Sequence, residues 1–340
     1  MPKVIAEIGV NHNKSYSILK ELIIGSKEAG ADYVKFQRFI SSDEISDKAD
    51  LAKYQRNGKI NYKSQLEMAK SLEMPDKLLI DGINLCKKCN IKPLCSPFEI
   101  ESINFISKTL NLSEVKVPSP EITNVPYLKK IANSFKKIFL STGASHLWEI
   151  GYALEVLKEI NSSLDITLLH CISEYPAPYD SLNLKCINTL SNTFNLPVGF
   201  SDHSTGFIGS LAALSIGAEV IEKHITLDQN LPGPDHKASA SLEDLAIICD
   251  FAKQVKDMMG DGIKRPSNAE IPNKDLIRKS AYVNVNTIKK GDVFTQSLYS
   301  CKRPYDPLLI SPEKIEMFFG HKFNKDKKFD DGISLSDFLC

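Results

Sequence analysis

Two hydrophobic patterns alternate along most of the chain. Short runs rich in valine and isoleucine are typical of buried strands, and stretches with apolar residues three or four positions apart are typical of amphipathic helices. The expected strands are Val4–Val10, Tyr33–Gln37, Lys92–Phe98, Glu114–Ser119, Lys137–Gly143, Asp165–Cys171, Pro197–His203 and Glu219–Thr226. The helical stretches between them include Ile18–Ala29, Asp76–Cys89, Trp148–Ile160 and Phe207–Ile216. This α/β alternation predicts a closed parallel (β/α)8 barrel, the TIM barrel, rather than an open sheet.

The pattern changes after the expected helix Leu242–Met259. We assign residues 1–260 to the barrel, residues 261–278 to a polar linker, and residues 279–340 to a small unit of short strands and turns. A unit of about 60 residues can bury only a limited core. The insertion Phe39–Tyr62, directly after the second strand, is expected to be an active-site loop.

Composition and charge exclude several classes of protein. Lys and Arg number 42 and Asp and Glu also 42, so the chain lacks the basic excess of a nucleic-acid-binding protein. No apolar run approaches the roughly 20 residues of a membrane span, and Met1-Pro2-Lys3 leads into a strand without a signal peptide. Cys86 and Cys89 form a lone Cys-x-x-Cys, for which incidental reduced thiols are favoured over a metal or redox site. We expect a cytoplasmic protein that binds neither nucleic acid nor membrane.

Polar residues gather where the expected strands end. Functional groups of a parallel barrel lie at the C-terminal ends of its strands. In strand order, these ends carry Glu7; Lys35 and Gln37; Ser96; Lys116, Ser119 and Glu121; Ser141 and Thr142; His170, Ser173 and Tyr175; Ser201, Asp202 and His203; and Glu222 and His224. One such residue alone would most often be a satisfied core polar group. The same bias in all eight strands predicts a charged barrel mouth.

The last strand carries three ionisable residues in a row. Alternate residues of a strand face opposite ways, so Glu222 and His224 are expected inside the barrel and Lys223 on the helix side. Glu222 is then expected to orient His224 or a neighbouring lysine, and Lys223 to be structural.

His203 and His224 end neighbouring strands, so their imidazoles can share one ion. Two neutral imidazoles leave positions open for water and substrate oxygens, which suits a catalytic Lewis acid more than a structural metal. Mn²⁺ or Mg²⁺ is favoured over zinc because no cysteine or aspartate cluster accompanies the histidines. A histidine acid/base pair without metal is the alternative.

Lysines and small hydroxyl side chains predict an anion site. Lys35 and Lys116 rise from the second and fourth strands, and Ser96, Ser119, Ser141 and Ser201 end other strands. Ammonium groups and hydroxyls around one cavity suit phosphate and carboxylate. A lysine that forms a Schiff base is the rival interpretation.

Nine short motifs at the strand ends match one family in order. They are Ala6–Asn13, Val34–Gln37, Cys95–Phe98, Lys116–Glu121, Leu140–Gly143, Leu169–Pro178, Gly199–His203, Val220–His224 and Gly233–His236. Any one of them is a weak signal, but the ordered set is a strong one. Over essentially its whole length the chain resembles the sialic acid synthases, which are the N-acetylneuraminate synthases and their legionaminic and pseudaminic acid relatives.

The resemblance implies an enzyme, a transferase that condenses phosphoenolpyruvate with N-acetylmannosamine or a related N-acylated hexose to give a nonulosonic acid and phosphate. A metal would activate the sugar aldehyde, and phosphate would leave by C–O cleavage. A legionaminic or pseudaminic acid synthase with a diacetamido-trideoxyhexose acceptor is the alternative within the family. A Schiff-base pyruvate aldolase or lyase and a non-catalytic carbohydrate-binding protein are the alternatives from other classes.

The resemblance also implies roles for residues. Glu7, Glu121 and Lys116 are the expected catalytic residues, with either glutamate orienting the attacking water or offsetting positive charge. The expected contacts to phosphoenolpyruvate are Lys35, Ser96, Lys116, Ser141 and Ser201, those to the sugar are Gln37, Tyr175 and Asp235, and Ser119 and Ser173 complete the substrate site. Pro120 replaces the usual glycine, which constrains the backbone before Glu121.

The C-terminal unit carries Lys302-Arg303-Pro304 and resembles the antifreeze-like (SAF) domain of these synthases, although Tyr305 follows where glycine is common. In the family this domain reaches across a dimer and places its arginine in the partner's active site. Arg303 matches that arginine, so the resemblance implies a domain-swapped homodimer.

Overall fold

The computed structural model describes residues 1–51 and 62–338. The chain divides into two compact units, Met1–Gly260 and Asp261–Cys340. Part of the expected insertion at residues 39–62 therefore lies outside the described residues.

The first unit is built on eight parallel strands in the order β3-β2-β1-β8-β7-β6-β5-β4. Their bounds are β1 Lys3–Gly9, β2 Tyr33–Arg38, β3 Lys92–Pro97, β4 Glu114–Val117, β5 Lys137–Ser141, β6 Asp165–Cys171, β7 Val198–Asp202 and β8 Val220–His224. The two edge strands, β3 and β4, also lie against each other, so the sheet curls into a barrel. The structure confirms the predicted (β/α)8 barrel.

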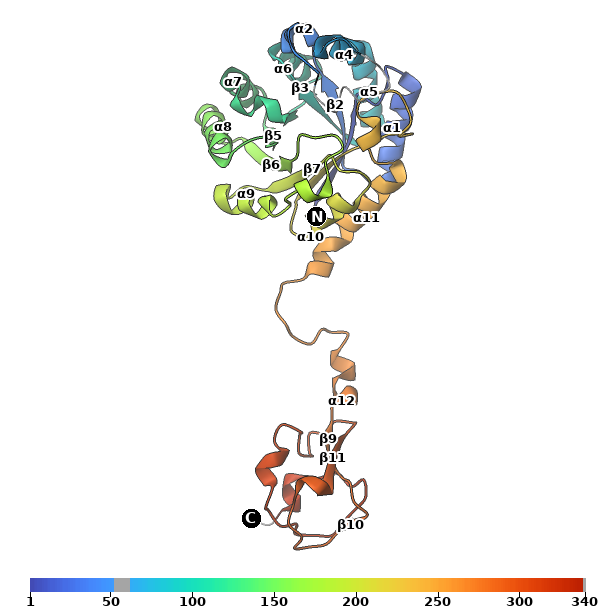
Figure 1. Ribbon diagram of the computed structural model, residues 1–340, viewed down its shortest axis with the longest axis vertical. Helices are drawn as coiled ribbons and strands as arrows, with labels where there is room; N and C mark the ends of the chain where they lie inside the picture. Colours follow the sequence, from blue (N-terminus) through green and yellow to red (C-terminus); the bar gives the residue numbers. More distant parts are fainter. Residues whose placement is uncertain (52–61, 339–340) are drawn as a thin grey trace. The chain divides into compact units, whose positions relative to one another are not determined.

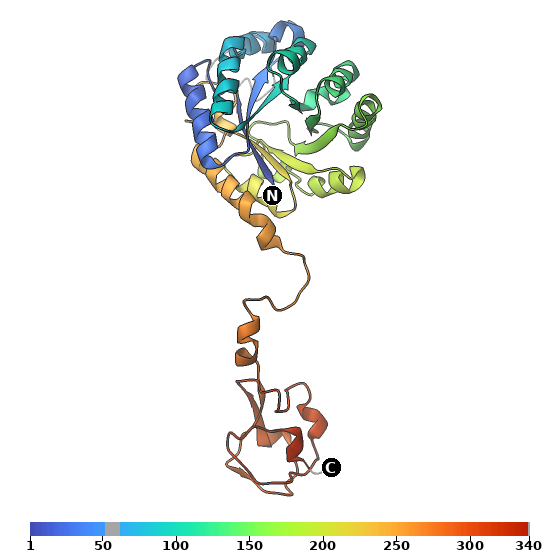
Figure 2. The same ribbon diagram turned by 180° about the vertical axis from the view of Figure 1, so that it is seen from behind.

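Helices form the outer layer around the strands, as Figures 1 and 2 show from opposite sides. They are α1 Tyr16–Ala29, α2 Ser41–Glu44, α4 Gln65–Leu72, α5 Asp76–Lys88, α6 Ile100–Asn104, α7 Val125–Ser134, α8 Leu147–Ile160, α9 Cys186–Phe194, α10 Ile208–Ser215 and α11 Leu242–Met259. Local sequence sets their ends. Ser15 caps the N-terminus of α1, and Gly30, at φ 94°, adopts the left-handed conformation that ends the helix.

The fourth strand is shorter than the predicted Glu114–Ser119. It ends at Val117, and Ser119–Thr123 form a 3-10 turn instead. Pro118 and Pro120 supply no backbone N–H, so neither can continue the ladder. As a consequence, Glu121 lies in the turn and not on the strand.

The barrel interior is layered by strand alternation. Its lower layer is apolar and consists of Ile5, Tyr33, Leu94, Phe139, Leu169 and Val220. Two residues further along these strands stand Glu7, Lys35, Ser96, Ser141, Cys171 and Glu222. Since residues i and i+2 share a face, this second layer lies above the apolar one, towards the C-terminal ends of the strands.

Lys223 lies on the opposite face of β8, as the sequence predicted. Its ammonium group contacts Asp202 Oδ2 at 3.1 Å and also the carbonyl oxygen of Ser204, and Lys223 and Asp202 are both fully buried. The Ser210 hydroxyl of α10 donates to the same carboxylate at 2.7 Å. Lys223 therefore ties β8 to β7 and to the helix layer, which confirms its structural role.

Replacing Lys223 with methionine should lower the free energy of unfolding by about 3–5 kcal/mol, because Asp202 would remain buried without its cation. Urea unfolding followed by circular dichroism measures the change. The double variant Lys223→Met with Asp202→Asn should recover most of the loss, since no unpaired charge remains. Lys253→Met, which breaks the exposed ion pair with Asp250, is the control and should have little effect. An unaffected Lys223→Met protein would contradict this assignment.

The second unit is small and rich in turns. Strand β9 (Ser280–Val283) pairs antiparallel with β11 (Tyr299–Lys302), and β10 (Thr287–Ile288) with β12 (Lys327–Lys328). Its core gathers around Phe294 and Phe323, and a short helix, α12 (Lys274–Ile277), lies in the segment expected to be a linker.

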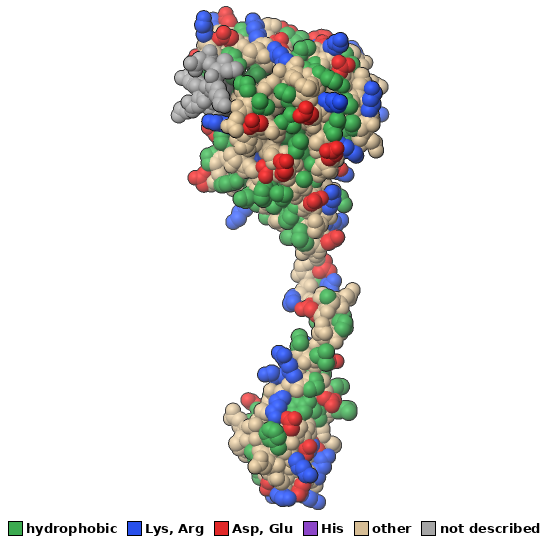
Figure 3. Space-filling model, turned by 90° about the vertical axis from the view of Figure 1, so that its right-hand side faces the viewer, with side chains coloured by type: hydrophobic (Ala, Val, Ile, Leu, Met, Phe, Trp, Pro, Cys, Tyr) green, Lys and Arg blue, Asp and Glu red, His purple; other side chains and the backbone are tan. Residues whose placement is uncertain are grey.

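The surface reflects the equal numbers of basic and acidic residues in the chain. On the faces of the two units seen in Figure 3, basic and acidic side chains are intermixed rather than separated by sign. None of the helices described is long and apolar enough to cross a membrane.

The Cys-x-x-Cys pair consists of free thiols, Cys86 and Cys89. Burial, together with the neighbouring Cys89, raises the pKa of Cys86 to about 12.

Candidate active site

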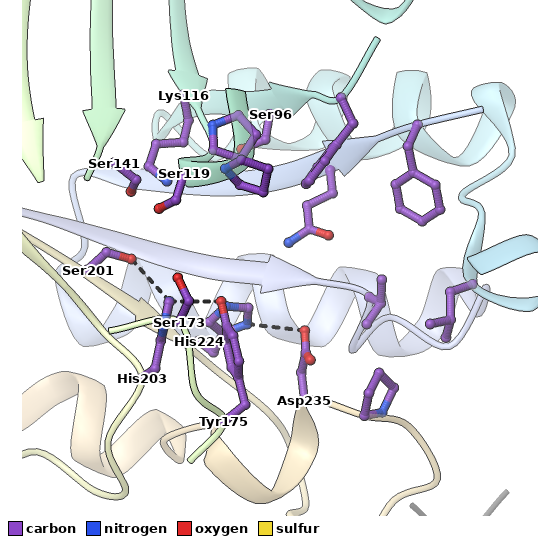
Figure 4. A pocket seen from close by; sticks show the side chains of 18 of the residues that line it. Ser96, Lys116, Ser119, Ser141, Ser173, Tyr175, Ser201, His203, His224 and Asp235 are labelled. Atoms are coloured by element: carbon purple, nitrogen blue, oxygen red, sulfur yellow. Dashed lines mark hydrogen bonds and ion pairs between the residues drawn. The ribbon is translucent and has the colours of Figure 1, made fainter. Parts of the chain in front are cut away.

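A cavity opens at the C-terminal ends of the barrel strands. The predicted site residues that line it are Lys35, Gln37, Ser96, Lys116, Ser119, Ser141, Ser173, Tyr175, Ser201, His203, His224 and Asp235. Figure 4 shows Ser96, Lys116, Ser119 and Ser141 on one side and Ser201, His203, Tyr175 and Asp235 on the other. Residues up to 200 positions apart in sequence thus converge on one site, from Lys35 to Asp235.

Two buried lysines meet at one carboxylate in the second layer. Glu222 lies 3.3 Å from Nζ of Lys35 through Oε2 and 3.3 Å from Nζ of Lys116 through Oε1. The Ser201 hydroxyl donates to Oε1 at 2.8 Å. Glu7 Oε1 contacts Lys35 Nζ at 3.2 Å and accepts from Gln37 at 2.7 Å. Glu222 therefore orients neighbouring lysines, one of the two roles predicted for it.

Burial sets the charge of this layer. It raises the pKa of Glu7 to about 7, against the opposing effect of Lys35. Burial also lowers the pKa of Lys116, although Glu222 opposes the shift. For Glu222, burial favours the neutral form, but Lys116 and Lys35 outweigh it and the pKa falls. The layer thus places two lysines beside one firmly ionised carboxylate, Glu222, while the pKa of Glu7 is shifted towards the neutral form. This balance favours an anion.

Hydroxyl groups border the lysines. The Ser141 side chain is 2% exposed, and its Oγ has no hydrogen-bond partner among the described residues. Ser119 Oγ accepts from the Gly143 amide at 3.0 Å. A Cβ on Gly143 would lie 2.5 Å from Ser173 Oγ and 2.9 Å from Ser119 Oγ, so glycine is required for these groups to gather. Such hydroxyls suit phosphate or carboxylate oxygens.

The two histidines lie close together on the other side of the cavity, with ring centroids 5.8 Å apart. Nδ1 of His203 is 2.6 Å from the Ile172 carbonyl oxygen, to which it donates, so Nε2 carries a lone pair. Nε2 lies 3.0 Å from the Tyr175 hydroxyl and 3.3 Å from Ser201 Oγ. Burial lowers the pKa of His203 to about 4 and that of His224 well below its usual value. Both rings are therefore neutral at pH 7.

These donors fit a divalent metal ion. Nδ1 of His224 is buried and makes no hydrogen bond among the described residues, and it lies 3.6 Å from Asp235 Oδ2. A buried ring nitrogen that makes no hydrogen bond destabilises the folded state unless a metal ion or another ligand binds it. In the described part of the chain, no group of three or more His, Cys, Asp or Glu side chains surrounds one point. An ion here would take its remaining ligands from water or substrate, as an open site requires.

The first strand adapts to these groups at Gly9, where the register with β2 shifts. Gly9 has φ 51°, and a Cβ on it would lie 3.2 Å from Gln37 Nε2 and 3.4 Å from His224 Cε1. Glycine thus allows the chain to turn away directly beside the site.

Three predicted residues are not part of the cavity lining. Glu7 is fully buried in the second layer, where it contacts Lys35 and Gln37. Glu121 is buried in the turn after β4 and accepts from Asn124 Nδ2 at 2.6 Å, outside the cavity lining. Arg303 belongs to the second unit, where it is exposed and makes no ion pair within the described residues, whereas neighbouring Lys302 pairs with Asp330 at 2.6 Å. Their catalytic and binding roles stay predictions.

Sequence reasoning missed part of the lining. Sγ of Cys171 lies 3.2 Å from Oγ of Ser119. Apolar residues that follow β2 and β3, and others from the α2–α4 region, also line the cavity. Strand alternation beyond Gln37 and Ser96 could have identified Phe39 and Phe98. No sequence signal linked Met68 of α4 to the cavity.

Fold and site together define a (β/α)8-barrel protein with two buried lysines beside two neutral histidines in one cavity. The chain belongs to the NeuB family, whose model matches residues 22–264. It is 46% identical over 97% of its length, and 98% of the relative, to an N,N'-diacetyllegionaminic acid synthase of Campylobacter jejuni. A protein of the same description from Legionella pneumophila is 38% identical over 87% of this chain and 83% of its own. Among solved structures, the N-acetylneuraminic acid synthetase of Leptospira borgpetersenii matches with a TM-score of 0.71 and 29% identity over 80% of this chain and 90% of its own.

Proposed function

We propose that this protein is a phosphoenolpyruvate-dependent nonulosonic acid synthase that makes N,N'-diacetyllegionaminic acid from a diacetamido-trideoxyhexose. The relatives described as N,N'-diacetyllegionaminic acid synthases, at 46% and 38% identity, support this acceptor better than N-acetylmannosamine, the acceptor first expected from the sequence.

The observation that carries the proposal is the pair of buried lysines beside two neutral imidazoles in one cavity. Lys35, Lys116 and the unpartnered Ser141 hydroxyl suit the phosphate and carboxylate of phosphoenolpyruvate. The histidines face a second part of the cavity, next to Tyr175 and Asp235, where a polar sugar can bind. One site thus offers adjacent places for an anionic and a carbohydrate substrate.

The arrangement accounts for the bonds that change. C3 of phosphoenolpyruvate attacks the aldehyde carbon of the open-chain sugar, and positive charge develops at C2. We assign Glu7, which contacts Lys35 at 3.2 Å, the role of offsetting that charge or of accepting a proton from the water that adds to C2. The bond between C2 and the phosphate oxygen then breaks, the C2 hydroxyl loses its proton to become the keto group, and the former aldehyde oxygen takes up a proton to become a hydroxyl. Lys35 and Lys116 hold the departing dianion.

The two histidines are proposed to hold Mn²⁺ or Mg²⁺ through His203 Nε2 and His224 Nδ1. Bound there, the ion would supply Lewis-acid polarisation of the aldehyde oxygen. Tyr175 stacks on His203 with centroids 4.1 Å apart and keeps that ring in place. Asp235, whose pKa burial raises to about 6, borders His224 on the sugar side.

Phosphate release tests the function directly. The protein should release phosphate from phosphoenolpyruvate when the legionaminic acid precursor is present, more slowly with N-acetylmannosamine or the pseudaminic acid precursor, and not without sugar. Mass spectrometry should show a nine-carbon 2-keto acid product. A Schiff-base aldolase would instead be trapped on Lys35 or Lys116 by borohydride with pyruvate, and such an adduct would contradict the proposal.

Lys116→Met should raise KM for phosphoenolpyruvate by about 10–100-fold, because a charge-assisted hydrogen bond contributes about 1.5–3 kcal/mol. KM for the sugar should change far less. Lys92→Met, which removes an exposed lysine with a 64% accessible side chain at the start of β3, is the matched control. Steady-state kinetics with each substrate varied separately measure the difference, and equal changes in both KM values would refute the assignment.

A further inference from the structure

A group of apolar side chains lines part of the cavity. Its members are Phe39, Ile45, Met68, Leu72 and Phe98, which we call the apolar wall, and Glu44 and Gln65 of the same region also line the cavity. The rings of Phe39 and Phe98 meet edge to face, with centroids 5.8 Å apart and planes at 80°, a favourable aromatic contact. Met68 is 6% exposed and belongs to α4. The wall is therefore a packed surface that faces the cavity.

The aromatic members of the wall, Phe39 and Phe98, lie nearer the mouth than the anion-binding lysines do. Along β2, the same face carries Lys35, then Gln37, and Phe39 just beyond the strand. Along β3 it carries Ser96, then Phe98 beyond the strand end. Each two-residue step advances about 6.5 Å. A substrate group that touches the wall is thus remote from the lysines and from the reacting carbons.

Acceptor sugars differ in the groups that can reach this wall. The aldehyde carbon must meet phosphoenolpyruvate deep in the cavity, so the remaining carbons of the sugar extend towards the mouth. Compared with N-acetylmannosamine, a diacetamido-trideoxyhexose carries a second acetamido group in place of one hydroxyl and lacks another hydroxyl altogether. Its remote part is more apolar and gains more from burial against apolar side chains. A hydroxyl placed there would lose hydrogen bonds to water.

We propose that the apolar wall selects the diacetamido-trideoxyhexose over N-acetylmannosamine, with Met68 and Leu72 of α4 as specificity-determining residues. This inference rests on the proposed function. It assigns acceptor choice to α4, while the lysines and histidines serve the chemistry common to both sugars.

The test compares kcat/KM for the two sugars in matched variants. Met68→Gln and Leu72→Gln add a polar group of similar size and should each lower the preference for the diacetamido sugar about tenfold, near the lower end of what apolar pockets discriminate. Met68→Leu keeps the wall apolar and should retain the preference. Met258→Gln makes the same chemical change at a 60% exposed position of α11 and should leave both values unchanged. Circular dichroism and KM for phosphoenolpyruvate verify that each variant is folded.

The outcomes separate this inference from the function on which it rests. A wild-type protein that prefers the diacetamido sugar, with folded glutamine variants that lose the preference, supports both. A wild-type preference that both glutamine variants retain overturns the role of the wall and leaves the proposed function standing. A wild-type protein that prefers N-acetylmannosamine, or releases no phosphate with either sugar, overturns both.

Discussion

Replacing His203 or His224 with alanine should lower kcat by about 100–1,000-fold while the barrel stays folded. Loss of one preorganised group that stabilises developing charge has an effect of this order, and two histidines can hold an ion only together. We expect both variants to fold because the two histidines lie at strand ends: His203 comes directly after β7, and His224 is the last residue of β8. Both face the cavity and not the helix layer.

Metal content provides a second measurement that does not depend on turnover. The wild-type protein should bind about one Mn²⁺ per chain in an electron paramagnetic resonance titration, as an open two-histidine site implies, and each alanine variant should lose that binding. His146→Asn, which keeps a capping side chain at the start of α8, should alter neither metal binding nor rate. Exhaustive chelation should abolish activity and added Mn²⁺ restore it. Full activity after chelation would instead support a metal-free histidine pair.

Mixing an Arg303→Ala chain with a Lys116→Ala chain should restore activity at a low phosphoenolpyruvate concentration, at which each variant alone is nearly inactive. The prediction is motivated by Arg303, which is exposed and has no ion pair within the described part of its own unit. A site for phosphate and carboxylate benefits from a bidentate guanidinium. In a two-fold dimer with exchanged C-terminal units, each site combines the barrel of one chain with Arg303 of the other.

The amount of recovered activity distinguishes the arrangements. With exchange, a mixed dimer has one site with both defects and one with neither, so random co-assembly restores about a quarter of wild-type activity. If Arg303 serves its own barrel, every site carries one defect and mixing restores nothing. Co-expression with two affinity tags isolates the mixed dimer, and light scattering establishes its mass. Arg278→Ala, in place of Arg303→Ala, is the control and should be fully active when expressed alone.

Local sequence was sufficient for the barrel and for the direction of most site residues. The strands are short runs of the right length, most of them with β-branched residues, and period-two alternation then determines which side chains face inward. That alternation alone assigns Lys223 to the helix side and Glu222 and His224 to the barrel interior. The fourth strand was predicted to end at Ser119 but ends at Val117, because Pro118 and Pro120 interrupt the hydrogen-bonded ladder.

Contacts between distant strands were decided only by the tertiary structure. Glu222 on β8 meets Lys35 on β2 and Lys116 on β4 because the barrel closes, and no spacing in the sequence encodes that meeting. The turn after β4 directs Glu121 to Asn124, and α4 brings Met68 to the cavity. Alternation along a strand is a local property that the sequence displays by itself, whereas contacts across the barrel depend on curvature and packing of the whole chain.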